Sequence, residues 1–310
     1  MSDFVQQQNS ICNFTTSDSW VILSPIEQSI KKKIEAVGTP LKDWDINIYR
    51  GVLTGYNEAF IIDSEKRNEI LANCQTEDER KRTAELIRPI LRGRDIKRYA
   101  YEWAELWLIA TFPSRHYNID EYPAVKQYLL SYGIERLEQT GKIYNVNGEK
   151  IKSRKKTNNK WFETQDSISY WEDFNKPKIV WGEISDRSKF VYESRGKFIP
   201  EATTFLMVGN HLPYLYCVLN SPLSEWFFSK VGTTTGVGTV RWKKYTIQQL
   251  LLPRISDKQN NIFENYVELY FKGSLQTCDF AKKVNTEIYK LVGMTDIEID
   301  YVENFYPPLT

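Results

Sequence analysis

The chain has 310 residues, of which 41% are hydrophobic and 14% aromatic, enough to build one large domain or two modest ones. Its 41 basic and 40 acidic side chains leave a formal charge of +1, so bulk charge alone cannot hold nucleic acid and any nucleic-acid surface must be local. The four cysteines and two histidines are widely separated, which indicates neither a zinc site nor a disulfide framework. Because no segment resembles a signal peptide or a membrane span, we expect a cytoplasmic protein with no membrane partner.

The first predicted element is a helix from Pro25 to Val37. Ser24 is a typical N-cap residue, Pro25 suits the first helical position, and Glu27 completes a capping box with Ser24. Isoleucines recur every four positions, and Gly38 follows where a left-handed C-terminal residue is expected. The helix therefore has one apolar face that must pack against another part of the chain.

The middle of the chain, from Tyr49 to about Pro253, alternates short β-like runs with Gly, Asn and Pro. Arg195-Gly196 fits a hairpin turn between two of these runs, and helices are predicted at Glu77 to Ile87 and Leu212 to Val231. Because the alternation is irregular, we expect an α+β fold and not a wound parallel sheet. The predicted strands are Tyr49 to Val52, Ala59 to Ile62, Leu106 to Phe112, Lys178 to Ile184, Lys189 to Tyr192 and Thr203 to Val208.

After Pro253 the pattern is helical again. We expect a helix from Asp257 to Phe271, a second with an apolar stripe from Leu275 to Leu291 that Gly293 ends, and a short acidic one opened by Thr295. The predicted organisation is an N-terminal segment with a helical arm (residues 1–48), a β-rich domain (49–253) and a C-terminal helical arm (254–310). The apolar stripes of the two arms are too narrow for independent cores, so we expect the arms to fold back on each other.

The most informative segment runs from Lys142 to Lys160 and carries seven basic residues and one acidic residue. Trp161 to Asp166 follow directly, so charges that seek phosphates adjoin side chains able to stack on bases or to contact their edges. The alternative interpretation is an ordinary solvated loop.

Smaller basic clusters occur at Arg187 to Lys197 and at Arg241 to Lys244, the second just after the hydroxyl-rich run Gly232 to Thr239. Such a run can follow a phosphate backbone through its N–H groups, although a mobile loop is the simpler alternative. Asp95-Ile96-Lys97 matches the last half of a metal-dependent nuclease motif, but its upstream acidic residue is not recognisable. A structural aspartate held between arginines is favoured there.

Several catalytic motifs are not found in the sequence. An adenine methyltransferase needs an Asn/Asp-Pro-Pro-aromatic loop and a Gly-rich turn for the methyl donor, and neither is present. Pro307-Pro308 follows Tyr306 and precedes Leu309, so it does not fit that loop. P-loop, zincin and nucleophile-elbow motifs are not recognised either.

The order of the motifs resembles the TaqI-like C-terminal specificity domain of type IIG restriction enzymes and related adenine methyltransferases. The resemblance covers most of the chain, and residues 286–303 are similar to the tail of complete enzymes of this kind. The matching blocks are GVLTGYNEAF (51–60), RPILRGRDIKRY (88–99), SRKKTNNKWFETQD (153–166) followed by KPKIV (176–180), YLYCVLNSP (214–222) and Leu252-Pro253.

The resemblance implies a β-containing target-recognition domain that packs against helices and reads duplex DNA while a methyltransferase partner rotates adenine out of the stack. It implies no catalysis in this chain; S-adenosylmethionine, and Mg²⁺ if the enzyme cleaves, are expected in the catalytic partner domain or subunit, with a possible nuclease domain beside it. Because the first specificity motif lies only about fifty residues from Met1, the chain is expected to be a fragment, an excised domain or a separate subunit. The expected DNA contacts are Thr54, Asn57, Arg94, Arg98, Arg154, Lys155, Lys156, Lys160, Trp161, Gln165, Arg187, Lys189, Arg241, Lys243 and Lys244.

Three alternatives remain open at this level. The first is a diverged nuclease or methyltransferase, which methyl-donor binding or Mg²⁺-dependent nicking lost in Asp95→Ala would support. The second is a type I-like specificity subunit lacking half its length, which copurification with a modification subunit would support. The third is an interaction scaffold whose aromatic residues form only a core.

Overall fold

The computed structural model describes residues 23–231, 233–234 and 240–305. They form two compact units. The helical unit contains the described residues up to Ile46, then 185–188 and those from Pro213 onward, and the sheet unit contains 47–184 and 189–212. Mostly antiparallel sheets with helices packed beside them give the predicted α+β fold. The helical unit joins segments from both ends of the chain. The three predicted domains with boundaries after residues 48 and 253 stay a prediction.

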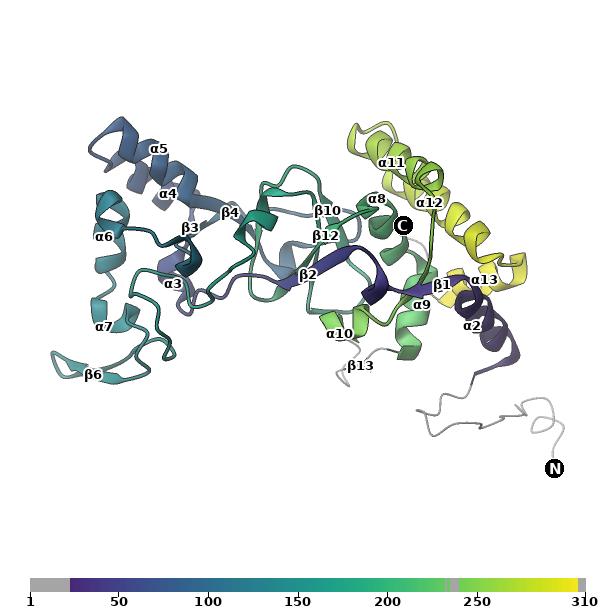
Figure 1. The fold of residues 1–310 in the computed structure, drawn as a ribbon, viewed down its shortest axis with the longest axis horizontal. Helices are drawn as coiled ribbons and strands as arrows, with labels where there is room; N and C mark the ends of the chain where they lie inside the picture. The colour runs from purple at the N-terminus through teal and green to yellow at the C-terminus, as the bar shows by residue number, and fades with distance from the viewer. Residues whose placement is uncertain (1–22, 232, 235–239, 306–310) are drawn as a thin grey trace, which may run out of the picture. The chain divides into compact units, whose positions relative to one another are not determined.

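The sheet unit is built on two four-stranded sheets (Figure 1). In the first, β8 pairs with β10 and β12 in antiparallel register, and β2 lies at the edge beside β12. In the second, the order is β11-β4-β5-β3, and only the β11–β4 pair is parallel. The strands are β2 (Ile46–Arg50), β3 (Ile61–Asp63), β4 (Ile87–Leu91), β5 (Leu106–Ile109), β8 (Lys178–Gly182), β10 (Phe190–Glu193), β11 (Ile199–Pro200) and β12 (Thr204–Gly209).

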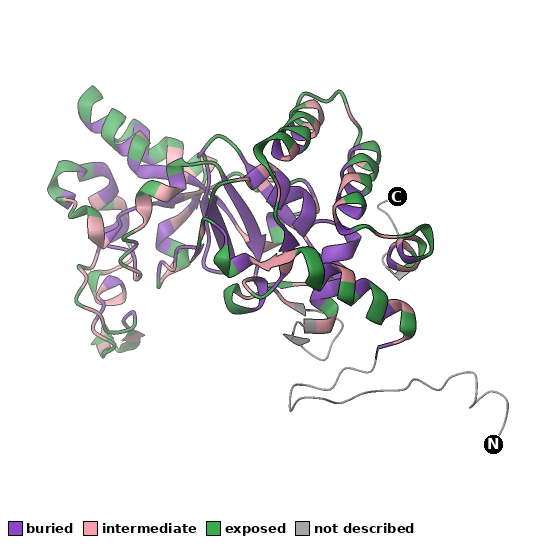
Figure 2. Ribbon diagram, turned by 45° about the vertical axis from the view of Figure 1, so that its right-hand side comes forward, coloured by how far each residue is buried: buried purple, intermediate pink, exposed green. Residues whose placement is uncertain are grey.

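The core of the sheet unit lies between these strands and its helices. Ile90, Leu108, Val180 and Leu206 are fully buried in one apolar cluster that spans both sheets. Figure 2 shows the central strands as buried and the outer faces of the helices as exposed. The helices are α3 (Asn57–Phe60), α4 (Ser64–Ala72), α5 (Glu77–Leu86), α6 (Pro123–Leu130) and α7 (Ile134–Leu137), with 3-10 turns η2 (Gly93–Asp95), η3 (Pro113–Arg115), η4 (Ile119–Glu121) and η5 (Trp171–Asn175).

Two predictions in this unit are wrong in detail. Residues 59–60 end helix α3, and only Ile61–Asp63 form a strand, because a short apolar run fits a helix and a strand equally well. Arg195-Gly196 is a turn, with Gly196 at φ 62°, but it does not join paired neighbours. Strands β10 and β12 both pair with β8, and between them Ile199–Pro200 crosses to the second sheet to pair with β4.

The helical unit contains the predicted helices at both ends of the chain. Its elements are α2 (Pro25–Val37), β1 (Gly38–Pro40), η1 (Leu41–Asp43), α8 (Leu212–Leu219), α9 (Pro222–Val231), β13 (Thr233–Thr234), β14 (Val240–Arg241), α10 (Lys244–Ile247), β15 (Leu251–Pro253), α11 (Asp257–Phe271), α12 (Thr277–Val292) and α13 (Asp296–Phe305), and β9 (Ile184–Ser185) lies at its boundary. The capping boxes at Ser24 and Thr295 are present as predicted. No helix within the described ranges has the length and apolar content that crossing a bilayer requires.

The structure corrects two boundaries in the helical unit. Gly38 is not left-handed: its φ of −83° and ψ of 141° are extended, because it starts strand β1 and pairs with Pro253 of β15. The single helix predicted from Leu212 to Val231 is two helices, α8 and α9. The break falls at residues 220–221, because Pro222 has no N–H to continue the helix and suits the first turn of a new one.

The terminal arms contact each other, as predicted. Ile30 and Ile34 of α2 and Ile288 of α12 are buried, and α2 packs against α12. The Glu298 carboxylate of α13 accepts hydrogen bonds from the Ser29 hydroxyl and the Lys33 ammonium, each at 2.7 Å. This carboxylate is therefore turned toward α2, and the acidic surface expected on α13 is smaller than the sequence suggests.

Two buried carboxylates link α2 to helices α9 and α13. Burial opposes ionisation of Glu298, but hydrogen bonds from Lys33, Thr295 and Ser29 outweigh it and lower its pKa from 4.5 to about 2. At Glu27, burial raises the pKa, but hydrogen bonds from Lys230, Ser24 and Tyr301 outweigh it and lower the pKa to about 2. A carboxylate whose pKa is lower in the folded state than in the unfolded state stabilises the fold at pH values above its unfolded pKa. This stabilisation is lost as the pH falls from the unfolded pKa through the folded pKa.

We therefore expect Glu298→Gln to lose about 1–2 kcal/mol of unfolding free energy at neutral pH and to flatten the acid dependence of stability between pH 4.5 and about 2. Thermal unfolding across that pH range measures both effects. Glu268→Gln is the control, because Glu268 pairs with Lys272 on the exposed surface of α11, where such a pair contributes little. An equal effect of the two substitutions would contradict the role of Glu298.

Candidate nucleic-acid interface

The basic segment begins in a two-stranded hairpin of the sheet unit. Strands β6 (Ile143–Val146) and β7 (Glu149–Lys152) are antiparallel and joined by Asn147-Gly148. Both turn residues have positive φ, 51° and 89°, as a two-residue type I′ turn requires. Asn-Gly is the residue pair that adopts this turn most readily, so the sequence contains a signal for a hairpin that the prediction of a DNA-contacting segment did not include.

One side of this hairpin carries only exposed side chains. Directly opposed residues of an antiparallel pair point to the same side, and the sides alternate along each strand. Ile143 lies opposite Lys152, and Asn145 lies opposite Lys150. These four residues, which we call the hairpin face, are all exposed, and Ile143 exposes 65% of its surface.

The base of the hairpin is fixed by hydrogen bonds. The Tyr144 hydroxyl on the opposite side donates to the Glu138 carboxylate at 2.5 Å, and the Ser153 hydroxyl donates to the carbonyl oxygen of Lys142 at 3.0 Å. The Gly141 N–H donates to the carbonyl oxygen of Arg154. The hairpin face is therefore held in a defined orientation at its base while its tip remains exposed.

Arg154, a predicted DNA contact, is buried and has a structural role. Only 4% of its surface is exposed. Its guanidinium donates hydrogen bonds of 2.6–2.8 Å to the carbonyl oxygens of Leu137, Thr54, Glu163 and Trp161. Burial lowers its pKa from 12.5 to about 10, against the opposing effect of the Glu163 charge. Because these donors are already used inside the fold, we leave Arg154 out of the interface.

Two of the sequence motifs meet at this arginine. The motif at 51–60 turns at Gly55, whose φ of 78° favours glycine, and a Cβ at this position would collide with the Gln165 side chain. The Gln165 N–H donates to the carbonyl oxygen of Leu53 at 3.1 Å. Thr54 is fully buried and donates to the Asn57 side chain, which is exposed. Thr54 therefore positions Asn57 and is itself inaccessible to DNA.

The remaining predicted contacts of this segment lie at or near the surface. Lys155, Lys156 and Lys160 are exposed, and Gln165 is half-buried. Trp161 is also half-buried and packs edge-on against Phe162 at 5.5 Å between ring centroids. The structure thus places three lysines directly after the hairpin within the same unit.

The RPILRGRDIKRY block contains a structural aspartate. Asp95 is buried, and the Arg92 guanidinium donates to both of its carboxylate oxygens, with a shortest distance of 2.7 Å. This confirms the interpretation of Asp95 as held by an arginine. Within the described ranges no group of three or more His, Cys, Asp and Glu could hold a metal ion. Arg94 is exposed and Arg98 half-buried, so both reach the surface.

The other predicted contacts are divided between the units. Lys189 belongs to the sheet unit and is half-buried, whereas Arg187 belongs to the helical unit and forms a 2.7 Å salt bridge with buried Glu225. Lys244 is exposed near Trp242, which is buried and stacks on Phe228 at 3.9 Å. Arg241 and Lys243 are half-buried in the same unit. Gly232 and residues 235–239 of the hydroxyl-rich run lie outside the described residues.

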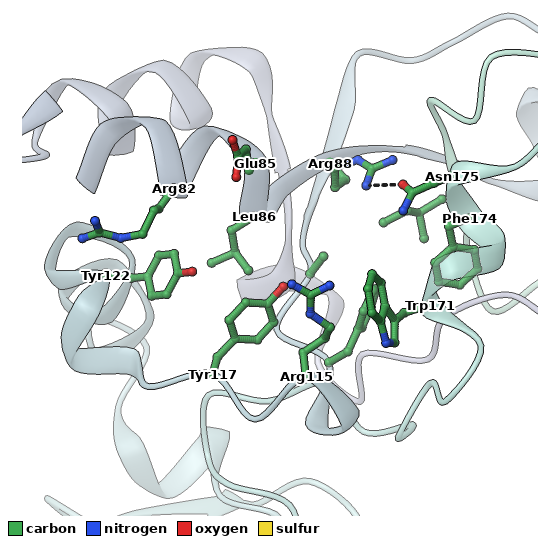
Figure 3. A pocket seen from close by; sticks show the side chains of 13 residues that line it. Arg82, Glu85, Leu86, Arg88, Arg115, Tyr117, Tyr122, Trp171, Phe174 and Asn175 are labelled. Atoms are coloured by element: carbon green, nitrogen blue, oxygen red, sulfur yellow. Dashed lines mark hydrogen bonds between the residues drawn. The ribbon is translucent and has the colours of Figure 1, made fainter. Parts of the chain in front are cut away.

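The sheet unit also contains a cavity of about 200 Å³ that the sequence did not indicate (Figure 3). Its polar lining includes Arg82, Arg88 and Arg115, and Glu85 is an acidic residue beside them. Tyr117, Tyr122 and Trp171 form much of its aromatic wall. These residues are separated by up to ninety positions in the sequence, so no local motif could reveal them.

Residues 88–252 match the family of TaqI-like C-terminal specificity domains. The match covers more than half of the chain. The chain belongs to this family. The matched residues include the hairpin face, Arg154 and the three exposed lysines, so the geometry described above is that of a specificity domain.

The specificity domain is similar to parts of longer proteins. It is 22% identical over 289 residues to the type II methyltransferase M.PaeR7I of Pseudomonas aeruginosa, covering 91% of this chain and 44% of that protein. Among solved structures, the type IIG restriction endonuclease BpuSI matches at a TM-score of 0.51 and 13% identity, over 92% of this chain and 34% of its own. The type IIL restriction-modification enzyme MmeI, solved in complex with DNA, matches at a TM-score of 0.47 and 15% identity, over 88% of this chain and 34% of its own. The chain thus spans less than half of these relatives.

Proposed function

We propose that this chain recognises a specific sequence in double-stranded DNA on behalf of an adenine-specific methyltransferase of a restriction-modification system. The observation that carries the proposal is the exposed face of the β6–β7 hairpin. Two lysines, an asparagine and an isoleucine stand side by side on a fixed ribbon, and none of them is buried by the rest of the unit.

The dimensions and chemistry of the hairpin face suit the major groove of DNA. A two-stranded ribbon fits that groove, and an asparagine amide can pair with the N6 and N7 atoms of adenine. Lys150 and Lys152 supply charge to neighbouring phosphates or to guanine, and Ile143 offers an apolar surface to a thymine methyl group. Asn145 is the residue of this face that we assign to base discrimination.

Phosphate contacts of the sheet unit are proposed for Lys155, Lys156 and Lys160, which are exposed and follow the hairpin directly. Thr54 and Arg154 are left out because they are buried, and Arg187 contributes less because Glu225 neutralises it. Further proposed contacts, whose side chains are exposed or half-buried, are Asn57, Arg94, Arg98, Trp161, Gln165, Lys189, Arg241, Lys243 and Lys244.

The partner that we propose is a methyltransferase domain or subunit that binds S-adenosylmethionine, with Mg²⁺ if a nuclease accompanies it. The cavity of the sheet unit does not suit this cofactor. The cavity of the sheet unit presents three guanidinium groups, which would repel the sulfonium cation. Similarity to a type II methyltransferase over 44% of that protein supports a division in which the catalytic residues lie outside the matched region.

We expect Lys150→Ala combined with Lys152→Ala to lower the slope of log K against log salt by about 1.8, at roughly 0.9 per lost phosphate contact. A 30-base-pair duplex in a fluorescence-anisotropy titration measures the slope. In a selection from a randomised duplex pool, we expect the unaltered chain to prefer one base at the position that Asn145 contacts, by about 1–3 kcal/mol over the other bases. Asn145→Ala should lose this preference.

Lys126→Ala is the matched control, because this lysine lies on α6 of the same unit, outside the hairpin, and pairs with Asp120. It should leave the slope and the selected sequence unchanged. If the hairpin variants behave like this control, the hairpin does not contact DNA. If the unaltered chain enriches no sequence at low salt, the proposed recognition function is wrong.

A further inference from the structure

The cavity of the sheet unit combines unpaired positive charge with aromatic surface. Arg82, Arg88 and Arg115 line it, and within the described ranges no carboxylate forms a salt bridge with any of the three. The exposed Glu85 leaves the lining with a net charge of +2. The charge of the Glu193 carboxylate offsets part of that of Arg88. The positive charge that remains around this concave surface favours binding of an anion.

Two of these arginines are held in place by uncharged groups. The Arg88 guanidinium donates to the Asn175 side chain at 3.0 Å and to the carbonyl oxygens of Gly196 and Lys197. The Arg115 guanidinium lies 3.8 Å from the centre of the Trp171 ring and 5.5 Å from the Tyr117 ring. Figure 3 shows Arg115 between these rings and Arg88 across the cavity. Neutral partners fix both guanidinium groups without cancelling their charge.

The aromatic part of the lining provides a surface for a planar ring. Tyr117 packs edge-on against Tyr122 at 5.9 Å between ring centroids. Burial raises the pKa of the Tyr117 hydroxyl against the opposing charges of Arg115 and Arg88, so the hydroxyl stays protonated at neutral pH and can donate a hydrogen bond. A cavity of about 150 Å³ holds benzene, so the 200 Å³ here has room for a base but not for a whole nucleotide. The lining residues Arg82 and Glu85 are exposed, so the cavity opens to the surface and the rest of a nucleotide can extend out of it.

We propose that this cavity binds a single nucleotide unit, with its phosphate between Arg88 and Arg115 and its base against the tyrosine wall. Guanidinium groups pair with phosphate through directed, charge-assisted hydrogen bonds, and tyrosine rings stack on bases. This site is separate from the hairpin face and shares no residue with it. The unit is supplied either by a free nucleotide or by a nucleotide displaced from a DNA duplex.

Calorimetric titration of the full chain with 5′-AMP tests the proposal, with adenosine and inorganic phosphate as partial ligands. AMP should bind, and both partial ligands should bind more weakly, because each lacks half of the complementary chemistry. Arg115→Ala should weaken AMP binding by about tenfold or more, and Arg115→Lys by less, since lysine keeps the charge but not the planar fork. Arg82→Ala, at an exposed position, provides a second variant if Arg115→Ala fails to fold.

Arg80→Ala is the matched control, because Arg80 is exposed on the same helix, α5, and does not line the cavity. Absence of AMP binding at millimolar concentration, or equal binding by the Arg115→Ala and Arg80→Ala variants, would overturn the proposal. Two duplexes, one perfect and one with a single bulged nucleotide, distinguish the sources. Arg115→Ala should weaken only the bulged duplex if DNA supplies the nucleotide, and neither duplex if free nucleotide does.

The hairpin variants separate this proposal from the one on sequence recognition. Lys150→Ala combined with Lys152→Ala should lower affinity for perfect duplex and leave AMP binding unchanged. Arg115→Ala should do the reverse. An unaltered chain that binds duplex but not AMP shows that the nucleotide site is wrong, and one that binds AMP but enriches no DNA sequence shows that the recognition function is wrong.

Discussion

Replacing Arg154 by Met should destabilise the protein by about 3–5 kcal/mol without removing any DNA contact. Four buried backbone carbonyl oxygens lose this donor, and that of Glu163 keeps another from the Gln139 amide. Each unsatisfied buried group costs roughly 1–3 kcal/mol before the structure relaxes. The carbonyls come from three chain segments that this side chain joins: the turn at Thr54, the end of α7 at Leu137, and the loop at Trp161 to Glu163. Urea unfolding measured by circular dichroism gives the free energy.

Lys155→Met is the matched control for this experiment. Lys155 is the next residue, carries the same charge and is exposed, so its substitution should change stability by no more than about 0.5 kcal/mol. It should instead weaken DNA binding. If Arg154→Met proves as mild as Lys155→Met in urea, the guanidinium does not bridge the three segments.

This pair of residues shows what a charge run in a sequence can and cannot predict. Seven basic residues between 142 and 160 indicate a surface that attracts an anion, but the run does not indicate which residue turns inward. Arg154 is buried because the turn at Gly55 and the segment around Trp161 present carbonyl oxygens to which its guanidinium donates. That demand arises from tertiary contacts, so residue type and spacing alone could not assign Arg154 a structural role.

Local signals predicted the elements whose ends are fixed by neighbours in the sequence. Ser24 and Thr295 open helices through side-chain bonds to residues three positions away, and both were predicted. The β6–β7 hairpin was not predicted because its strands bury no apolar face and therefore show little alternation. Its local signal is Asn147-Gly148, and the prediction for this segment was based on its charge and not on this turn. The cavity could not be predicted at all, because its arginines come from three separate elements.

The second large effect is expected at a buried ion pair in the first sheet. Lys178 is fully buried, and its ammonium contacts the Glu193 carboxylate at 2.6 Å across the β8–β10 pair. The same carboxylate accepts the N–H groups of Arg195 and Lys197, so it also shapes the turn that follows β10. Glu193→Gln keeps the shape of the side chain but leaves a buried cation without its counter-charge. We expect a loss of about 3–5 kcal/mol in urea unfolding.

A double substitution tests whether the lost charge is the cause. Lys178→Met with Glu193→Gln removes both charges, and it should be more stable than Glu193→Gln alone because no unpaired buried charge remains. Phe174, whose carbonyl oxygen accepts from the Lys178 ammonium at 2.8 Å, loses that donor in the double variant, so recovery should be partial. A double variant that is no more stable than Glu193→Gln would assign the effect to the turn at 195–197 and not to the cation.

The pH dependence of Glu193→Gln provides an independent measure. Burial lowers the pKa of Lys178, and the Glu193 carboxylate is the group that opposes this lowering, so the pKa should fall further in the variant. Between the folded pKa and the unfolded value of about 10.4, the unfolded chain binds more protons, and the free energy of unfolding rises with pH. The deficit of Glu193→Gln relative to the unaltered chain should therefore shrink as the pH increases from about 7 toward 10, because folded Lys178 can then lose its proton. Urea unfolding at several pH values measures the deficit, and one that stays constant would show that the Lys178 cation is not its source.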